Sequence, residues 1–174
     1  MRLFPIFLTA IMTLLMNIFA FAQMNNIKII PNAKKIGEYS YSYFIWDIYN
    51  IALYAENNDA SNGQNIALML TYKRDLKGQD ISARSISEIR NLGFKHEDIL
   101  QSWQDKMDHI FPNVQDGTVL TGIRYSDKVV FYQNGREIGI IQDAEFSRYF
   151  FDIWLSPNTS EPDMRKALLG LDIE

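Results

Sequence analysis

The sequence contains no cysteine, and this absence excludes several kinds of protein. Disulfide bonds, thiolate nucleophiles and lipoprotein anchors are impossible, so an apolar core must hold the fold together. Only two histidines occur, His96 and His109. On one predicted helix they are rotated from each other by about 220°, so they cannot share a metal ion. We therefore expect no metal site and no cofactor.

The chain also lacks an excess of positive charge, because 17 Lys and Arg residues are set against 21 Asp and Glu residues. Nucleic acids and anionic membrane surfaces bind proteins through clusters of Lys and Arg. Neither is expected as the main partner. The sequence shows no internal repeat, no low-complexity tract and no G-x-S-x-G hydrolase motif, so it does not name a reaction.

Residues 1–22 have the pattern of a signal peptide. Arg2 precedes the uncharged run 3–21, and small residues stand three and one positions before a cut after Ala22. A retained membrane anchor is the alternative, because such a run is nearly long enough to span a bilayer. The polar residues after Ala22 favour cleavage. The pattern thus predicts a periplasmic or secreted protein with a mature domain over 23–174, no stable membrane insertion and a net charge of −5 once Arg2 is removed.

The periodicity of apolar residues predicts strands, two helices, strands and two more helices. Strands are expected over 25–31, over 34–56 as one long or bent strand pair, and over 66–75, 118–125, 128–133 and 136–141. Helices are expected from about residue 80 to near Gly93, over 96–111, from after Asp143 to Pro157, and over 162–169. A surface loop is expected over 57–65. This segregated order predicts an α+β fold, with an antiparallel sheet covered on one face by helices.

Local signals fix some of the boundaries. Asp80 or Ser82 could cap the first helix, and Gly170 could end the last one. Asn134-Gly135 predicts a type I′ hairpin turn, because both residues tolerate a positive φ.

The segment "FSRYFFDIWLSP" (146–157) is strongly aromatic, with its apolar residues at helical spacing. Phe146, Tyr149 and Phe150 are expected in the core. Asp152 lies off the apolar stripe and should face solvent or pair with Arg148. A second aromatic group, Tyr39, Tyr41 and Tyr43, shares one face of a predicted strand. That face could be the cleft side or the open side of the sheet, and the sequence does not decide between them.

Three segments carry a family likeness: "GEYSYSYFIWDIYNIALYAE" (37–56), "GTVLTGIRYSDKVVFYQNGREIGII" (117–141) and "DAEFSRYFFDIWLSPNTSEPDMRKALLG" (143–170). In order and spacing they resemble the chalcone isomerase-like family, in its small bacterial exported branch. The likeness covers about residues 36–170. It implies a curved antiparallel sheet with helices layered on one face, and a ligand cleft between sheet and helices.

The resemblance also implies where catalytic residues would lie. Enzymes of this family cyclise a chalcone with an arginine, a threonine, a tyrosine, an asparagine and a late hydroxyl, and relatives without this activity bind fatty acids. Here these positions fall near Gly37, at Tyr49, near Ile81, near Glu88, and at Ile153 beside Trp154. The reaction needs a cation for a phenolate and donors for an enolate, and losing one donor costs about 10²-fold or more. No catalytic residue is therefore assigned, and isomerase activity is not expected.

The cleft is expected to be lined by Tyr49, Ile153 and Trp154, with Arg74 or Arg84 supplying charge for an acidic ligand. Each charged candidate has a simpler interpretation. Arg74 could belong to a solvated strand end, and Arg84 could form an ordinary surface pair with Glu88, worth a few tenths of a kcal/mol.

The favoured function is non-catalytic binding of a small apolar or amphipathic molecule, fatty acid-like or aromatic, by an exported protein. Two alternatives stay open. One is an intramolecular lyase or isomerase acting on an enone-type substrate, with Glu88 as the base. The other is a cell-envelope protein-interaction module whose cleft is filled by its own side chains. The oligomeric state is not predicted.

Overall fold

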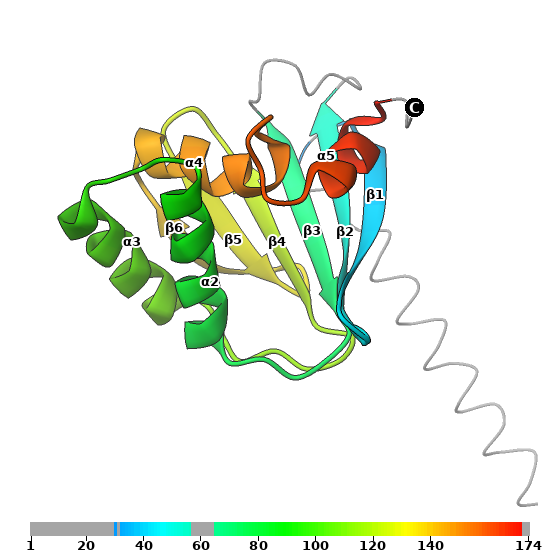
Figure 1. Ribbon diagram of the computed structural model, residues 1–174, viewed down its shortest axis with the longest axis horizontal. Helices are drawn as coiled ribbons and strands as arrows, with labels where there is room; N and C mark the ends of the chain where they lie inside the picture. The colour runs from blue at the N-terminus through cyan, green and yellow to red at the C-terminus, as the bar shows by residue number, and fades with distance from the viewer. Residues whose placement is uncertain (1–29, 31, 57–64, 172–174) are drawn as a thin grey trace, which may run out of the picture.

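The computed structural model describes residues 30, 32–56 and 65–171, and in that part of the chain six strands form one antiparallel sheet (Figure 1). The strands are β1 (Ala33–Tyr43), β2 (Trp46–Glu56), β3 (Ile66–Tyr72), β4 (Val119–Arg124), β5 (Val129–Gln133) and β6 (Arg136–Ile141). They lie side by side in chain order. The signal peptide, most of the strand predicted over 25–31, and the loop over 57–64 fall outside the described residues.

Four helices are described, and all lie on the same face of the sheet (Figure 1). Helices α2 (Gly78–Asn91) and α3 (Glu97–Ile110) connect β3 to β4, whereas α4 (Ala144–Leu155) and α5 (Pro162–Leu169) follow β6. The predicted α+β fold with helices on one face is confirmed. Within the described residues, no helix is both long and apolar enough to cross a membrane.

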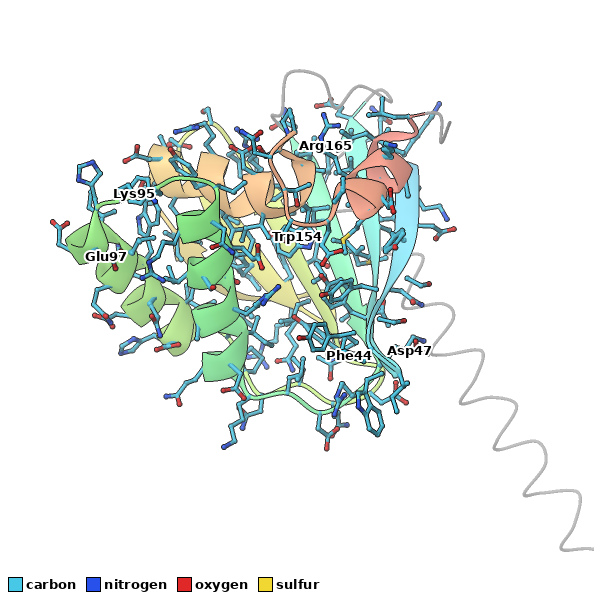
Figure 2. The ribbon with its side chains drawn as sticks, in the orientation of Figure 1. Phe44, Asp47, Lys95, Glu97, Trp154 and Arg165 are labelled. Carbon is cyan, nitrogen blue, oxygen red and sulfur yellow. The ribbon has the colours of Figure 1, made fainter. Side chains whose placement is uncertain are left out.

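Tight turns join neighbouring strands. Asn134 and Gly135 have φ values of 49° and 81°, so the predicted type I′ turn between β5 and β6 is confirmed. The segment predicted as a strand pair is the hairpin of β1 and β2. Its turn contains Phe44, whose φ is 54° and whose side chain is 85% exposed. Phe44 lies at the tip of this hairpin (Figure 2).

Two predicted boundaries were wrong. Helix α2 begins at Gly78 with Lys77 as N-cap, so neither Asp80 nor Ser82 caps it. Ser82 is buried, and its hydroxyl donates to the Gly78 carbonyl at 3.1 Å. The helix starts early because the backbone N–H of Gly78 donates to the side chain of Asn113 at 3.1 Å, a residue far along the chain. Strand β3 ends at Tyr72, three residues before the predicted end.

The main core lies between the sheet and the helices, and aromatic rings dominate one end of it. Trp103 of α3 is 1% exposed and contacts Phe146 edge-on, with ring centroids 5.5 Å apart. Phe146 in turn stacks on Phe150 at 5.3 Å. Such pairs add about 0.5–1.5 kcal/mol to the stabilisation from burial. A second, smaller cluster around Ala67 and Ile123 covers part of the opposite face of the sheet.

Asp143 fixes the start of α4. Its carboxylate accepts hydrogen bonds from the backbone N–H of Glu145 and Phe146, both at 2.9 Å, and from the indole N–H of Trp103, also at 2.9 Å. Partial burial opposes ionisation, but these three donors outweigh it and hold the pKa of Asp143 below its usual value of 3.8. The ionised form is therefore stabilised in the folded protein.

A lowered pKa in the folded state gives a defined pH dependence. The stability that Asp143 contributes is present above pH 3.8, its unfolded pKa, and is lost as the pH falls through the lower folded pKa. Asp143→Asn keeps an acceptor oxygen but removes the charge. We expect it to lower the free energy of unfolding by about 1 kcal/mol at pH 7, and by less at pH 3. Urea unfolding at the two pH values measures this, and an equal loss at both would contradict the assignment.

Candidate functional site

A cavity of about 410 Å³ lies between the sheet and the helices. Its floor is formed by strands, including Leu68 and Leu70 of β3 and Leu120 of β4, and α2 and α4 provide its walls. The lining is mainly apolar. Pockets of this kind, with a few polar groups at one end, are the usual binding sites for small molecules.

Tyrosines and a tryptophan form one wall of the cavity. The indole N–H of Trp154 donates to the hydroxyl of Tyr49 at 3.2 Å, linking α4 to β2. The ring of Tyr49 packs against Tyr41 and edge-on against Tyr72, with centroid separations of 5.1 and 6.0 Å. Burial raises the pKa of both Tyr49 and Tyr72 above the usual value of 10.0. Both phenols are therefore neutral near pH 7.

The polar end of the cavity is built by α2 and by the connection between α4 and α5. Glu88 is 6% exposed, and its two carboxylate oxygens have different partners. One oxygen pairs with the guanidinium of Arg84 at 2.5 Å, and the other accepts from the hydroxyl of Ser160 at 2.9 Å. Glu161 follows Ser160 and also lines the cavity, as does Asp80, which lies two turns before Glu88 on α2.

The structure brings five of the six predicted ligand-binding residues to this cavity: Tyr49, Arg84, Glu88, Ile153 and Trp154 all line it. Arg74 does not, which corrects its predicted position. Because β3 ends at Tyr72, the chain has left the sheet at Arg74, and the guanidinium instead lies 5.0 Å from the ring centroid of Trp46. Of the two alternatives for the cation, only Arg84 faces the cavity.

The positions that the resemblance assigns to catalysis also gather here, with one exception. Tyr49, Ile81, Glu88 and Ile153 line the cavity. Gly37 does not, and no side chain fits there. A Cβ at residue 37 would lie 2.6 Å from the carbonyl oxygen of Leu168, and closer still to that of Ala167, because α5 packs directly on β1.

The structure shows which of the predicted aromatic residues lie in the core and which line the cavity. Phe146 is fully buried in the core, as predicted, whereas Phe150 belongs to the core and also borders the cavity. The tyrosine face of β1 is the cleft side: Tyr41 and Tyr43 line the cavity, and Tyr39 packs against the main core.

Asp152 pairs with Arg148 at 3.8 Å, which was one of its two predicted arrangements. Burial raises the pKa of Asp152, while Arg124 and Arg148 oppose that rise. This pair lies outside the lining of the cavity.

Sequence reasoning did not identify Ser160 or Glu161 as site residues, and it treated Asp80 only as a helix cap. Ser160 and Glu161 reach the cavity because the connection after α4 folds back toward α2, where Ser160 contacts Glu88 across a separation of 72 residues; Asp80 lies on α2 itself. No local pattern signals such an approach. Within the described part of the chain, no group of three or more His, Asp or Glu side chains is placed to hold a metal ion.

Comparisons with known proteins give consistent matches. Residues 41–170 match a family model described as chalcone isomerase-like. An uncharacterized protein of Haemophilus influenzae is 29% identical over 136 residues, which cover 78% of this chain and 67% of that protein. Among solved structures, a fatty-acid binding protein of Arabidopsis thaliana aligns with a TM-score of 0.59 and 11% identity, over 80% of this chain and 87% of that one. At this identity the structural match shows a shared fold.

Proposed function

The chain belongs to the chalcone isomerase-like family, and from that premise we propose that it is a non-catalytic protein that binds a small apolar or amphipathic molecule. The observation that carries the proposal is the cavity of about 410 Å³, whose lining is mainly apolar with a polar end. This volume lies within the range of about 300–1,000 Å³ that small-molecule sites occupy. The structural relative from Arabidopsis thaliana is a fatty-acid binding protein, which supports an apolar ligand.

The charged groups of the cavity support the non-catalytic part of the proposal. A site that cyclises a chalcone needs a desolvated cation free to hold a phenolate. The only cation that lines the cavity in the described part of the chain is Arg84, whose side chain is 63% exposed and already paired with Glu88. Position 37, where the resemblance would place the arginine, is a glycine against α5.

The open cavity also bears on the interaction-module alternative, which requires a cleft filled by its own side chains. Trp154 and Tyr49 do contact each other, yet the space beside them is not filled. This arrangement favours a small ligand over a protein partner as the occupant.

Export to the periplasm or the medium is part of the proposal and rests on the leader pattern of residues 1–22. Cell fractionation followed by N-terminal sequencing tests it. A mature chain that begins at Gln23 is expected, whereas an intact leader in the membrane fraction would favour a retained anchor.

Ligand uptake can be tested by narrowing the cavity. Ile81 of α2 lines it and is partly buried, so Ile81→Trp should place a larger ring in the space where a ligand would lie. We expect the purified mature protein to carry or take up an apolar molecule in native mass spectrometry and lipid extraction. Ile81→Trp should lower the bound fraction about tenfold or more, because overfilled sites exclude their ligands.

Ala83→Trp is the matched control, because Ala83 lies on the same helix but is exposed and does not line the cavity. This variant should bind as the wild type does. Equal uptake by all three proteins would place the ligand elsewhere, and no uptake of fatty acids or flavonoids by the wild type would contradict the proposal.

A second candidate is an isomerase that uses Glu88 as a base, favoured by the burial of that carboxylate at the cavity wall. Both of its oxygens are already engaged, by Arg84 and Ser160, which makes it a poor acceptor for a substrate proton. Absorbance changes on incubation with chalcones and related enones separate the two candidates. Turnover that is lost in Glu88→Gln would favour the enzyme.

A further inference from the structure

The hairpin of β1 and β2 ends in an exposed apolar tip formed by Tyr43, Phe44, Ile45 and Trp46. These four consecutive residues are among the six large apolar residues that are exposed in the described part of the chain. Phe44 and Ile45 are 85% and 86% exposed, and the other two are more than half exposed. The tip lies at the end of the sheet away from α5 (Figure 1). Single exposed apolar residues are common, but a contiguous group usually marks an interaction surface.

The turn holds these side chains outward. Tyr43 and Trp46 are paired in the strand register, and behind them the hydroxyl of Ser42 donates to the carboxylate of Asp47 at 2.6 Å. Phe44 contacts Tyr43 edge-on, with ring centroids 4.7 Å apart. The φ of Phe44 is 54°, a conformation that glycine or asparagine adopts more easily than an aromatic residue. An aromatic residue in this position costs stability, which points to a role outside the fold.

The polarity of the tip changes from its apex to its base. The side chains of Phe44 and Ile45 at the apex have no polar atom, whereas Tyr43 and Trp46 at the base carry a hydroxyl and an indole N–H. Tyrosine and tryptophan are enriched at the level of lipid head groups, where the ring meets the apolar layer and its polar atom stays hydrated. Stable protein interfaces involve about 20–30 residues on each side, so four residues are few for a protein partner. A fluid bilayer accepts a narrow protrusion.

Cationic side chains stand beside the tip. The segment after β3 carries Lys73, Arg74 and Lys77, and none of the three forms an ion pair within the described part of the chain. This segment is attached to the hairpin, because the backbone N–H of Lys73 donates to the carbonyl of Ile48 at 2.9 Å. The guanidinium of Arg74 also lies 5.0 Å from the ring centroid of Trp46. Cations at this level are placed to meet lipid phosphates.

The local charge differs in sign from that of the whole chain. Asp47 at the tip and Asp75 in the segment 73–77 oppose the three cations, which leaves one positive charge in excess. The net charge of the mature chain is −5, which is why an anionic membrane was not expected as the main partner. Apolar contact must therefore supply most of the affinity for a membrane, and the cations a smaller part.

We infer that the hairpin tip docks on a phospholipid membrane surface, with Phe44 and Ile45 among the acyl chains and Lys73 and Lys77 at the phosphates. Such a contact is shallow and does not span the bilayer. Tyr43 also lines the cavity, so docking places the cavity beside the membrane. The inference goes beyond ligand binding and does not depend on it.

Vesicle binding by the mature protein tests the inference, because this form lacks the apolar leader of residues 1–22. Trp46 is the only exposed tryptophan of the three in the chain, since Trp103 and Trp154 are buried. Vesicles of equal parts phosphatidylcholine and phosphatidylglycerol should shift its emission to shorter wavelength, and lipids with brominated acyl chains should quench it. By sedimentation, the affinity should be about threefold or more higher than for phosphatidylcholine alone.

Removing the apex isolates the apolar contribution. Asparagine tolerates a positive φ, so Phe44→Asn with Ile45→Ser should keep the turn, and its affinity for vesicles should fall about tenfold or more. The matched control is Ile140→Ser with Leu171→Ser, which removes the two other exposed large apolar side chains of the described residues. They lie on β6, at the other edge of the sheet, and after α5. This control should bind as the wild type does, and thermal unfolding checks the fold of each variant.

Removing the lysines isolates the charge contribution. Lys73→Gln with Lys77→Gln should bind phosphatidylcholine vesicles as the wild type does but lose the preference for phosphatidylglycerol. Lys34→Gln with Lys95→Gln is the matched control, because these exposed lysines lie at the start of β1 and before α3, away from the tip. It should keep the preference. An unchanged preference in the first variant would overturn the role assigned to the cations.

The remaining outcomes decide the inference as a whole. No vesicle binding by the wild type, or equal binding by the wild type and the apex variant, would overturn it. A wild type that dimerises through the tip without binding vesicles would make the tip a contact between copies and would also overturn it. Ile81→Trp should bind vesicles as the wild type does, so failure of ligand uptake and failure of docking are measured separately. Loss of vesicle binding in Ile81→Trp would assign lipid contact to the cavity and not to the tip.

Discussion

Replacing Gly37 with alanine should lower the free energy of unfolding by about 3 kcal/mol or more, one of the two largest effects expected in this protein. The new Cβ would lie 2.6 Å from the carbonyl oxygen of Leu168 and nearer to that of Ala167. Both atoms belong to the backbone of α5, so no side chain can rotate away. The helix must shift, and Leu168 and Met164, which are 0% and 1% exposed, would lose part of their packing.

Gly122→Ala is the matched control for Gly37→Ala. Gly122 is also a strand glycine without a positive φ, and a Cβ there would lie 3.5 Å from Phe131 and 3.7 Å from Phe150, which is ordinary contact. We expect its free energy of unfolding to stay within about 1 kcal/mol of the wild type. Urea unfolding of both variants measures the difference. A mild effect of Gly37→Ala would mean that α5 does not pack closely on β1.

Phe146→Ala should cost about 3–5 kcal/mol, the usual loss for an aromatic residue removed from a core. Phe146 is 0% exposed, it lies among the rings of Trp103, Phe131 and Phe150, and it does not line the cavity. Its removal leaves a hole that the surrounding sheet and helices cannot easily close. Denaturant unfolding should show the full loss as a lower midpoint with an unchanged slope.

Trp154→Phe, on the same helix, should behave differently. It keeps a ring at the cavity wall but removes the N–H that donates to the hydroxyl of Tyr49. Loss of that partner costs about 1–3 kcal/mol. We expect this smaller loss of stability together with a changed ligand affinity. If Trp154→Phe destabilises the protein more than Phe146→Ala does, the division of this helix into core and cavity residues is wrong.

The order of helices and strands could be read from the sequence because each element carries its own local signal. The Asn134-Gly135 turn is an example: positive φ values favour these two residue types wherever they occur, and the structure has them. The α2 boundary was misjudged because Asn113, a residue distant in sequence, holds the first turn of that helix. Capping patterns describe only neighbours in the chain.

The candidate site was predictable in part. Tyr49, Ile153 and Trp154 were identified through a family resemblance that covers about residues 36–170. All three line the cavity. Ser160 and Glu161 were not identified as site residues. The sequence of a turn does not show whether its polar side chains contact solvent or a distant residue such as Glu88. Arg74 was misplaced because a strand three residues shorter than predicted directs its side chain elsewhere.

By itself, the sequence determined which segments form helices and strands and that an apolar layer must lie between them, since burial of apolar side chains follows from their periodicity. Only the tertiary structure decided that Arg84 pairs with Glu88 at the wall of a cavity and that Ser160, from a distant segment, binds the same carboxylate. The reason is physical: the field at a binding site depends on distances between charges, and those distances exist only once α2, β1 and the connection before α5 have packed together.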